Sequence, residues 1–136
     1  MTIKTLSVTL LLGSLPLLAT TGESLFDDKC MACHMKEKPT PQTRGTMVAP
    51  PAMGVMFHVK QAFGTDKEAA LAFVKEYVME PSAEKAKCLP RSIQRFGVMP
   101  SMKGTLSEEE LALIAEYLYE NYPPQGFVHG GGPAQQ

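Results

Sequence analysis

The stretch of sequence that decides the fold is Cys30-Met31-Ala32-Cys33-His34, which has the spacing C-x-x-C-H. Two thiols three residues apart lie on the same side of a helical turn, and an imidazole follows the second thiol directly. The chain has 136 residues with three cysteines and three histidines, so chance would produce this spacing in roughly one chain in 700 of the same composition. The motif therefore points to chemistry rather than to packing.

Three kinds of site use two cysteines at this spacing. A zinc site needs a second Cys/His pair at metal spacing, but Cys88 and His129 lie far apart in the sequence. A thioredoxin-like redox pair needs a βαβ context, which this sequence does not suggest. Haem attachment needs two thiols for the two vinyl groups and a histidine for the iron. We therefore predict one heme c per chain, attached to Cys30 and Cys33, with His34 as an axial iron ligand.

The second axial ligand is predicted from the sequence neighbours of each candidate. The chain has nine methionines, so the presence of a methionine does not by itself indicate a ligand. Met99 follows Gly97, which allows a close bend, and precedes Pro100, which favours an extended backbone. These neighbours favour Met99 as the ligand. Met102 and, as a bis-histidine alternative, His58 are the other candidates, and an open sixth position is a further one. The competing interpretation of each methionine is core packing.

The N-terminal segment has the pattern of an export signal. Lys4 precedes an uncharged run at residues 5–19, which is shorter than the span of about 20 apolar residues that crosses a bilayer. We predict a signal peptide over residues 1–19 and a periplasmic protein. Residues 17–19 match the small-x-small cleavage rule imperfectly, so the cleavage site is left open. An uncleaved membrane tether and a buried N-terminal helix are the alternatives.

Helical patterning dominates the rest of the chain, and three stretches show it: residues 22–35, 65–80 and 107–121. Thr65 with Glu68, and Ser107 with Glu110, have the spacing of capping boxes at helix starts. No run alternates convincingly as a strand would. The predicted fold class is all-α.

Proline and glycine set the remaining boundaries. Residues 36–59 contain four prolines and are predicted to form a loop, and a short helix is expected over residues 82–88, before Pro90. One domain is predicted over residues 20–123. Residues 124–136 are rich in Pro and Gly and are predicted to be a disordered tail.

The charges are nearly balanced, with 13 Lys and Arg against 14 Asp and Glu. This balance gives no reason to expect nucleic acid as a partner. Lys29, Lys36 and Lys38 surround the motif and are candidates for steering acidic partners, although a plain solvated face is an equal alternative. Arg91 and Arg95 are candidates for pairing with haem propionates, with surface exposure as the alternative.

Taken together, these residues resemble the class I monohaem cytochromes c. Gly22, Phe26 and Cys30 are four residues apart, as in the first helix of that family. Ile114 and Tyr117 resemble the apolar and aromatic pair in its last helix. The resemblance implies that these N- and C-terminal helices cross closely at a glycine, with loops wrapping one haem.

The loops add to the resemblance. The stretch at residues 49–54, Ala-Pro-Pro-Ala-Met-Gly, looks like the family's proline loop, which implies that the carbonyl of Pro50 or Pro51 accepts the ring N–H of His34. Residues 97–110 resemble the axial-methionine loop and the start of the last helix.

The chain also departs from the family. It has no Trp, and residues 55–96 match no branch. Cys88 is unexplained: a buried small hydrophobe, a free thiol and an intermolecular disulfide are the alternatives.

The motif and the resemblance imply an electron-transfer protein rather than an enzyme. We expect a one-electron carrier with His/Met-ligated heme c in an exported electron-transfer chain, whose partners are redox proteins. One alternative is a haem subunit of a larger oxidoreductase, docked at the periphery of a membrane-bound complex. The other is a five-coordinate haem sensor or enzyme.

Overall fold

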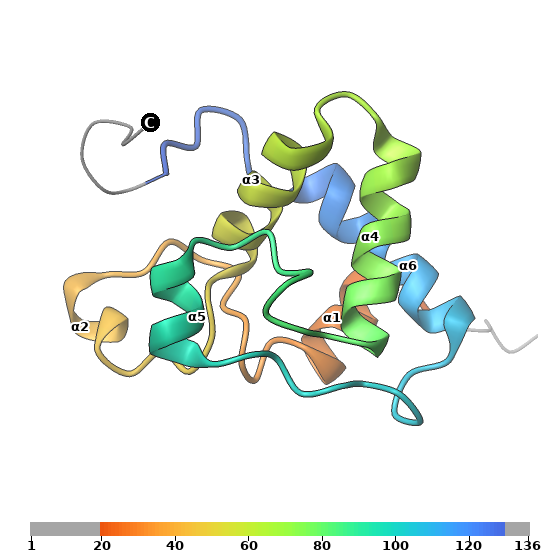
Figure 1. Ribbon diagram of the computed structural model, residues 1–136, viewed down its shortest axis with the longest axis horizontal. Coiled ribbons are helices and arrows are strands. Elements are labelled where there is room, and N and C mark those ends of the chain that lie inside the picture. The colour runs from red at the N-terminus through yellow and green to blue at the C-terminus, as the bar shows by residue number, and fades with distance from the viewer. Residues whose placement is uncertain (1–19, 130–136) are drawn as a thin grey trace, which may run out of the picture.

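The protein is all-helical over residues 20–129, the part of the chain that a computed structural model describes (Figure 1). The predicted signal peptide at residues 1–19 lies outside this part. The helices are α1 (Gly22–Lys29), α2 (Pro41–Arg44), α3 (Ala52–Phe63), α4 (Lys67–Met79), α5 (Pro90–Phe96) and α6 (Glu108–Asn121). The all-α prediction is confirmed. None of these helices is long and apolar enough to cross a membrane.

Helices α1 and α6 cross at a point where only glycine fits. A Cβ atom at Gly22 would lie 2.1 Å from the carbonyl oxygen of Leu113 and 2.7 Å from Cβ of Tyr117. One turn further along α1, the ring of Phe26 packs against Tyr117 with 6.0 Å between ring centroids. The missing side chain thus allows backbone-to-backbone contact, and the two helices cross as the resemblance implied.

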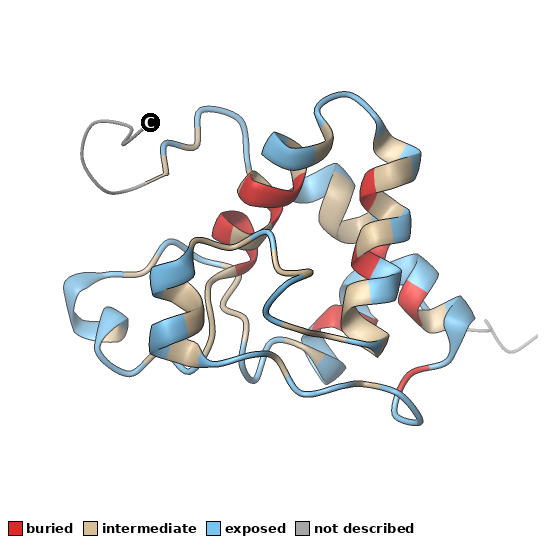
Figure 2. Cartoon of the chain, in the orientation of Figure 1, coloured by how far each residue is buried: buried red, intermediate tan, exposed pale blue. Residues whose placement is uncertain are grey.

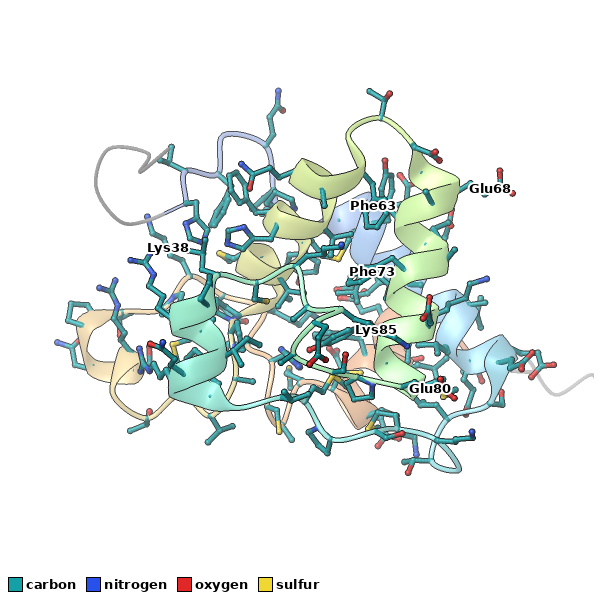
Figure 3. All side chains as sticks on the ribbon, in the orientation of Figure 1. Lys38, Phe63, Glu68, Phe73, Glu80 and Lys85 are labelled. Atoms are coloured by element: carbon teal, nitrogen blue, oxygen red, sulfur yellow. The ribbon has the colours of Figure 1, made fainter. Side chains whose placement is uncertain are left out.

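The hydrophobic core lies where α1, α3, α4 and α6 face one another, and Figure 2 shows the buried residues on these inner faces. The largest fully buried side chains are Phe26, Met56, Leu111 and Ile114. Between α3 and α4, Phe63 and Phe73 pack with their ring centroids 5.3 Å apart (Figure 3). Aliphatic, aromatic and thioether side chains therefore all contribute to this core.

Helices α4 and α6 both start at capping residues, and the cap of α6 is the predicted one. Ser107 Oγ accepts the N–H of Glu110 at 3.1 Å, and the Glu110 carboxylate accepts the N–H of Ser107 at 2.9 Å. The capping box predicted at Thr65 is wrong. Asp66 caps α4 instead, because its carboxylate accepts the N–H of Ala69 at 3.0 Å and carries a charge that the helix dipole favours.

Three of the predicted boundaries are wrong because the sequence analysis treated prolines as breaks. Residues 36–59 are not a continuous loop, since α2 begins at Pro41 and α3 begins directly after Pro51. Residues 82–88 form no helix, and α5 begins at Pro90. Proline suits the start of a helix, where its missing N–H would have no partner inside the helix.

Part of the C-terminal segment packs against the domain. Residues 124–129 follow a defined path, and the ring of Phe127 lies 5.9 Å from that of Phe57 on α3. Aromatic packing therefore holds this part of the predicted disordered tail against the domain. Residues 130–136 lie outside the described part.

The crossing makes Gly22→Ala the most informative stability variant. We expect it to lower the free energy of unfolding of the protein in a denaturant titration by about 1–3 kcal/mol, because the added methyl group overlaps backbone atoms of α6. Gly45→Ala is the matched control. A Cβ at Gly45 meets no atom within 4 Å and its φ is −69°, so we expect a change below about 0.5 kcal/mol. Equal stability of the two variants would contradict the close crossing.

Candidate haem-binding site

The C-x-x-C-H motif forms a tight turn at the end of α1. The N–H of Cys30 still bonds to the carbonyl of Phe26 at 2.8 Å, as in a helix. The N–H groups of Cys33 and His34 then both bond to the Cys30 carbonyl, at 3.1 and 2.9 Å. This turn holds the two cysteines and the histidine together. Cys30 is half-buried and Cys33 is exposed.

An apolar cavity lies beside this turn, among α1, α3, α4, α5 and α6. It has about 920 Å³ of empty volume, counting the part that opens to solvent. Cys30, His34 and Met99 all line it, and Cys33 does not. The walls are apolar and include Val55, Met56, Val74 and Ile114. Three of the four predicted site residues therefore meet at one cavity, and the fourth lies at the surface on the same turn.

His34 is held in one orientation by the loop that precedes α3. Its Nδ1 atom lies 2.8 Å from the carbonyl oxygen of Pro50 and donates to it. The carbonyl of Pro51 instead accepts the N–H groups of Gly54 and Val55 at the start of α3. The structure thus selects Pro50 from the two carbonyls that the resemblance left open. This bond leaves the Nε2 lone pair of His34 free for a metal.

The pKa of His34 lies below its usual value, because burial disfavours the charged imidazolium more than the Pro50 hydrogen bond favours it. The neutral imidazole is the form that binds iron. A neutral histidine, a thioether and a thiol facing one apolar cavity fit a flat, mostly apolar macrocycle that carries an iron ion.

The three candidates for the second axial ligand lie in different surroundings. Met99 lines the cavity, and the positive φ of 75° at Gly97 provides the bend that precedes it. Met102 packs against the hydrophobic core, and its N–H bonds to the carbonyl of Val78 at 3.0 Å. His58 is not part of the cavity lining. Of the three, Met99 alone faces the same cavity as His34.

The basic residues near the motif are mostly paired. Lys36 lies 2.7 Å from Asp27 and 3.0 Å from Glu23, and its side chain is 17% exposed. These hydrogen bonds, the one to Asp27 first, raise its pKa. Lys29 pairs with Asp28 at 3.2 Å. A cluster of three free lysines is therefore not present: local carboxylates largely neutralise two of the three.

The two arginines considered for the propionates lie on α5 and do not line the cavity. Arg91 is exposed. Arg95 donates to the carbonyl of Arg44 on α2, and its guanidinium lies 4.7 Å from the ring centroid of Phe96. Arg95 therefore links α5 to α2 at the surface.

Sequence reasoning missed part of the cavity wall. Val55, Met56 and Val59 of α3 line it, but the prolines before them suggested a loop. Cys88 also lines the cavity. It lies within residues 55–96, which matched no branch of the family, so the resemblance gave no expectation for its position. Its apolar setting fits the alternative of a small buried hydrophobe.

Comparison with known proteins identifies the family. A family model described as "Cytochrome C oxidase, cbb3-type, subunit III" matches residues 18–118. The chain belongs to this family of c-type cytochrome domains. Its fold is therefore that of a cytochrome c, its cofactor is heme c, and the domain is an electron-transfer module.

One relative is an uncharacterized protein of Aquifex aeolicus (strain VF5), which is 37% identical to this cytochrome. The match covers 74% of this chain and 73% of the relative. No solved structure matches the chain.

The half-buried position of Cys88 in the apolar cavity wall predicts low thiol reactivity. Burial raises its pKa, so less thiolate is present at a given pH than for a free cysteine. The difference in labelling rate between the parent and Cys88→Ala, measured with a thiol reagent on the haem-bearing protein, reports this residue alone. We expect slow labelling at pH 7.5, faster labelling as pH rises beyond about 8.5, the ordinary cysteine pKa, and rapid labelling after unfolding. Labelling that is equally fast in the native and unfolded protein would contradict the burial.

Proposed function

We propose that this cytochrome carries one electron at a time through a heme c that is attached to Cys30 and Cys33 and ligated by His34 and Met99. The observation that carries the proposal is that His34 and Met99 face one apolar cavity, beside the turn that holds both cysteines. The haem supplies the change between ferrous and ferric iron, and the protein supplies attachment, ligands and surroundings.

Each of these residues has a separate task. The two thiols fix the cofactor to the end of α1, so it stays bound in both redox states. The Pro50 carbonyl orients His34, which makes the imidazole a better electron donor. A thioether ligand from Met99 would favour ferrous iron relative to a second histidine, and the apolar walls would disfavour the additional positive charge of the ferric state. Both effects would raise the reduction potential.

With His34 and Met99 both bound, the iron would have no open position for a substrate. This supports a carrier rather than an enzyme or a gas sensor. The family description favours a second candidate, a haem subunit that stays docked in a larger oxidase. Native electrophoresis of a mild detergent extract separates the two: a carrier migrates at its own size, whereas a subunit migrates with the complex.

We propose that the protein is exported before haem attachment. The support is the pattern of residues 1–19, one lysine followed by a short uncharged run. Deletion of residues 2–19 should then abolish haem attachment although every ligand remains. Mature haem-bearing protein in the cytoplasm of the deletion strain would contradict the export proposal and the periplasmic location.

Replacing either cysteine of the motif tests the attachment. Cys30→Ser and Cys33→Ser should each weaken or abolish haem that survives acid–acetone extraction, because each thiol supplies one thioether bond. Cys88→Ser is the matched control and should retain full attachment. If neither motif variant lost the haem that resists extraction, the proposed attachment to Cys30 and Cys33 would be wrong.

Replacing Met99 tests the second ligand. Met99→Ala should keep the haem attached but lose the thioether–iron charge-transfer band of the ferric protein, lower the potential and let the ferrous protein bind CO. Met102→Ala is the control, since this residue packs against the core outside the cavity, and it should retain the band. If the two variants exchanged these results, Met102 would be the ligand. If neither changed the band, the ligand would lie elsewhere.

A further inference from the structure

Two histidines meet beside α3, outside the lining of the haem cavity. His58 lies on α3 and is 8% exposed, and His129 lies in the C-terminal segment. Val55, Met56 and Val59 of the same helix line the cavity, whereas His58 does not. The sequence analysis treated His58 only as an alternative iron ligand, and the structure gives it a different neighbour.

The two imidazoles approach through the same ring atom. The Nε2 atoms of His58 and His129 are 3.1 Å apart, the ring centroids are 4.6 Å apart and the ring planes meet at 68°. In a head-to-head N–H···N bond, the centroid separation would be the N···N distance plus the full distance from each centroid to its nitrogen. The observed separation is shorter than that sum, so the rings are bent toward each other rather than aligned end to end.

This bent arrangement matches two ligands on one metal ion. Histidine nitrogens lie about 2.0–2.1 Å from a zinc-sized ion, so two of them at 90–110° around it are about 2.8–3.4 Å apart. The measured 3.1 Å falls within this range. We propose that His58 and His129 bind a divalent ion from the end of the first transition row through their Nε2 atoms, with Cu(II) bound most tightly and Zn(II) less tightly.

Aromatic rings enclose the pair. Phe57 stacks on His129 with a centroid distance of 5.1 Å and an interplanar angle of 22°, and its ring also meets His58 edge-on at 5.3 Å. Phe127 lies 6.3 Å from His129. These rings restrict the imidazoles to one geometry, which lowers the entropy cost of binding an ion.

The surroundings of the two histidines limit how tightly they can bind an ion. Within residues 20–129 no group of three His, Cys, Asp or Glu side chains is placed to hold a metal, so water fills the other positions of this ion. Arg91 lies close enough for its charge to act on His58 and opposes a cation there. The result is a two-histidine site of moderate affinity that joins the C-terminal segment to α3.

The site is tested by equilibrium dialysis of the oxidised haem-bearing protein against Cu(II), and separately against Zn(II), followed by metal analysis. We expect one saturable equivalent of Cu(II) beyond the haem iron and weaker Zn(II) binding. His58→Gln and His129→Gln should each weaken Cu(II) binding at least about tenfold. The haem spectrum should stay unchanged in both variants, because neither residue lines the cavity.

Gln125→Ala is the control, since it alters the same segment and leaves both imidazoles in place. It should bind Cu(II) as the parent does. Because His58 is buried and its replacement can disturb the fold, the His129→Gln result is decisive. Absence of bound copper in the parent, or equal binding by the parent and His129→Gln, would overturn the proposal and leave the two rings as a hydrogen-bonded pair.

Discussion

The contact between α1 and α6 at Gly22 is the constraint on which the rest of the structure depends. With no side chain at this position, the backbone of α1 lies against Leu113 and Tyr117 of α6. The contacts of Gly22 and Phe26 with the capped α6 orient α1, and the turn with Cys30 and His34 begins where α1 ends. The absence of a side chain at Gly22 thus helps to set the position of the turn to which a cofactor can be attached.

A second chain of contacts sets the properties of the site. The loop before α3 supplies the Pro50 carbonyl to His34, and α3 itself then supplies apolar cavity wall. The bend at Gly97 brings Met99 to the same cavity. Each of these two side chains is therefore positioned by a loop next to a packed helix. If both bind the iron as we propose, this fixed placement is suited to rapid electron transfer.

Much of the fold could be predicted from short patterns. The motif, the spacing of Gly22 and Phe26, and the Ser107 capping box each depend on local chemistry that a sequence displays directly. Position also favoured Met99 over Met102, and the cavity lining agrees with that preference.

The features that the sequence analysis did not predict depend mainly on contacts between distant segments. Proline both ends and starts helices, so residues 36–59 gave no sign that α3 begins after Pro51. The pairing of Lys36 with Asp27 and Glu23 joins the motif loop to α1. The approach of His129 to His58 joins residues 71 positions apart. Neither pairing follows from spacing alone.

The optical spectrum of the purified protein in both redox states, with CO added to the reduced form, tests the central claim most directly. A His/Met-ligated carrier should show the thioether–iron charge-transfer band when oxidised, and its reduced spectrum should not change with CO, because both axial positions are filled. Absence of that band together with ready CO binding would contradict the account and indicate a five-coordinate haem that acts as a sensor or an enzyme.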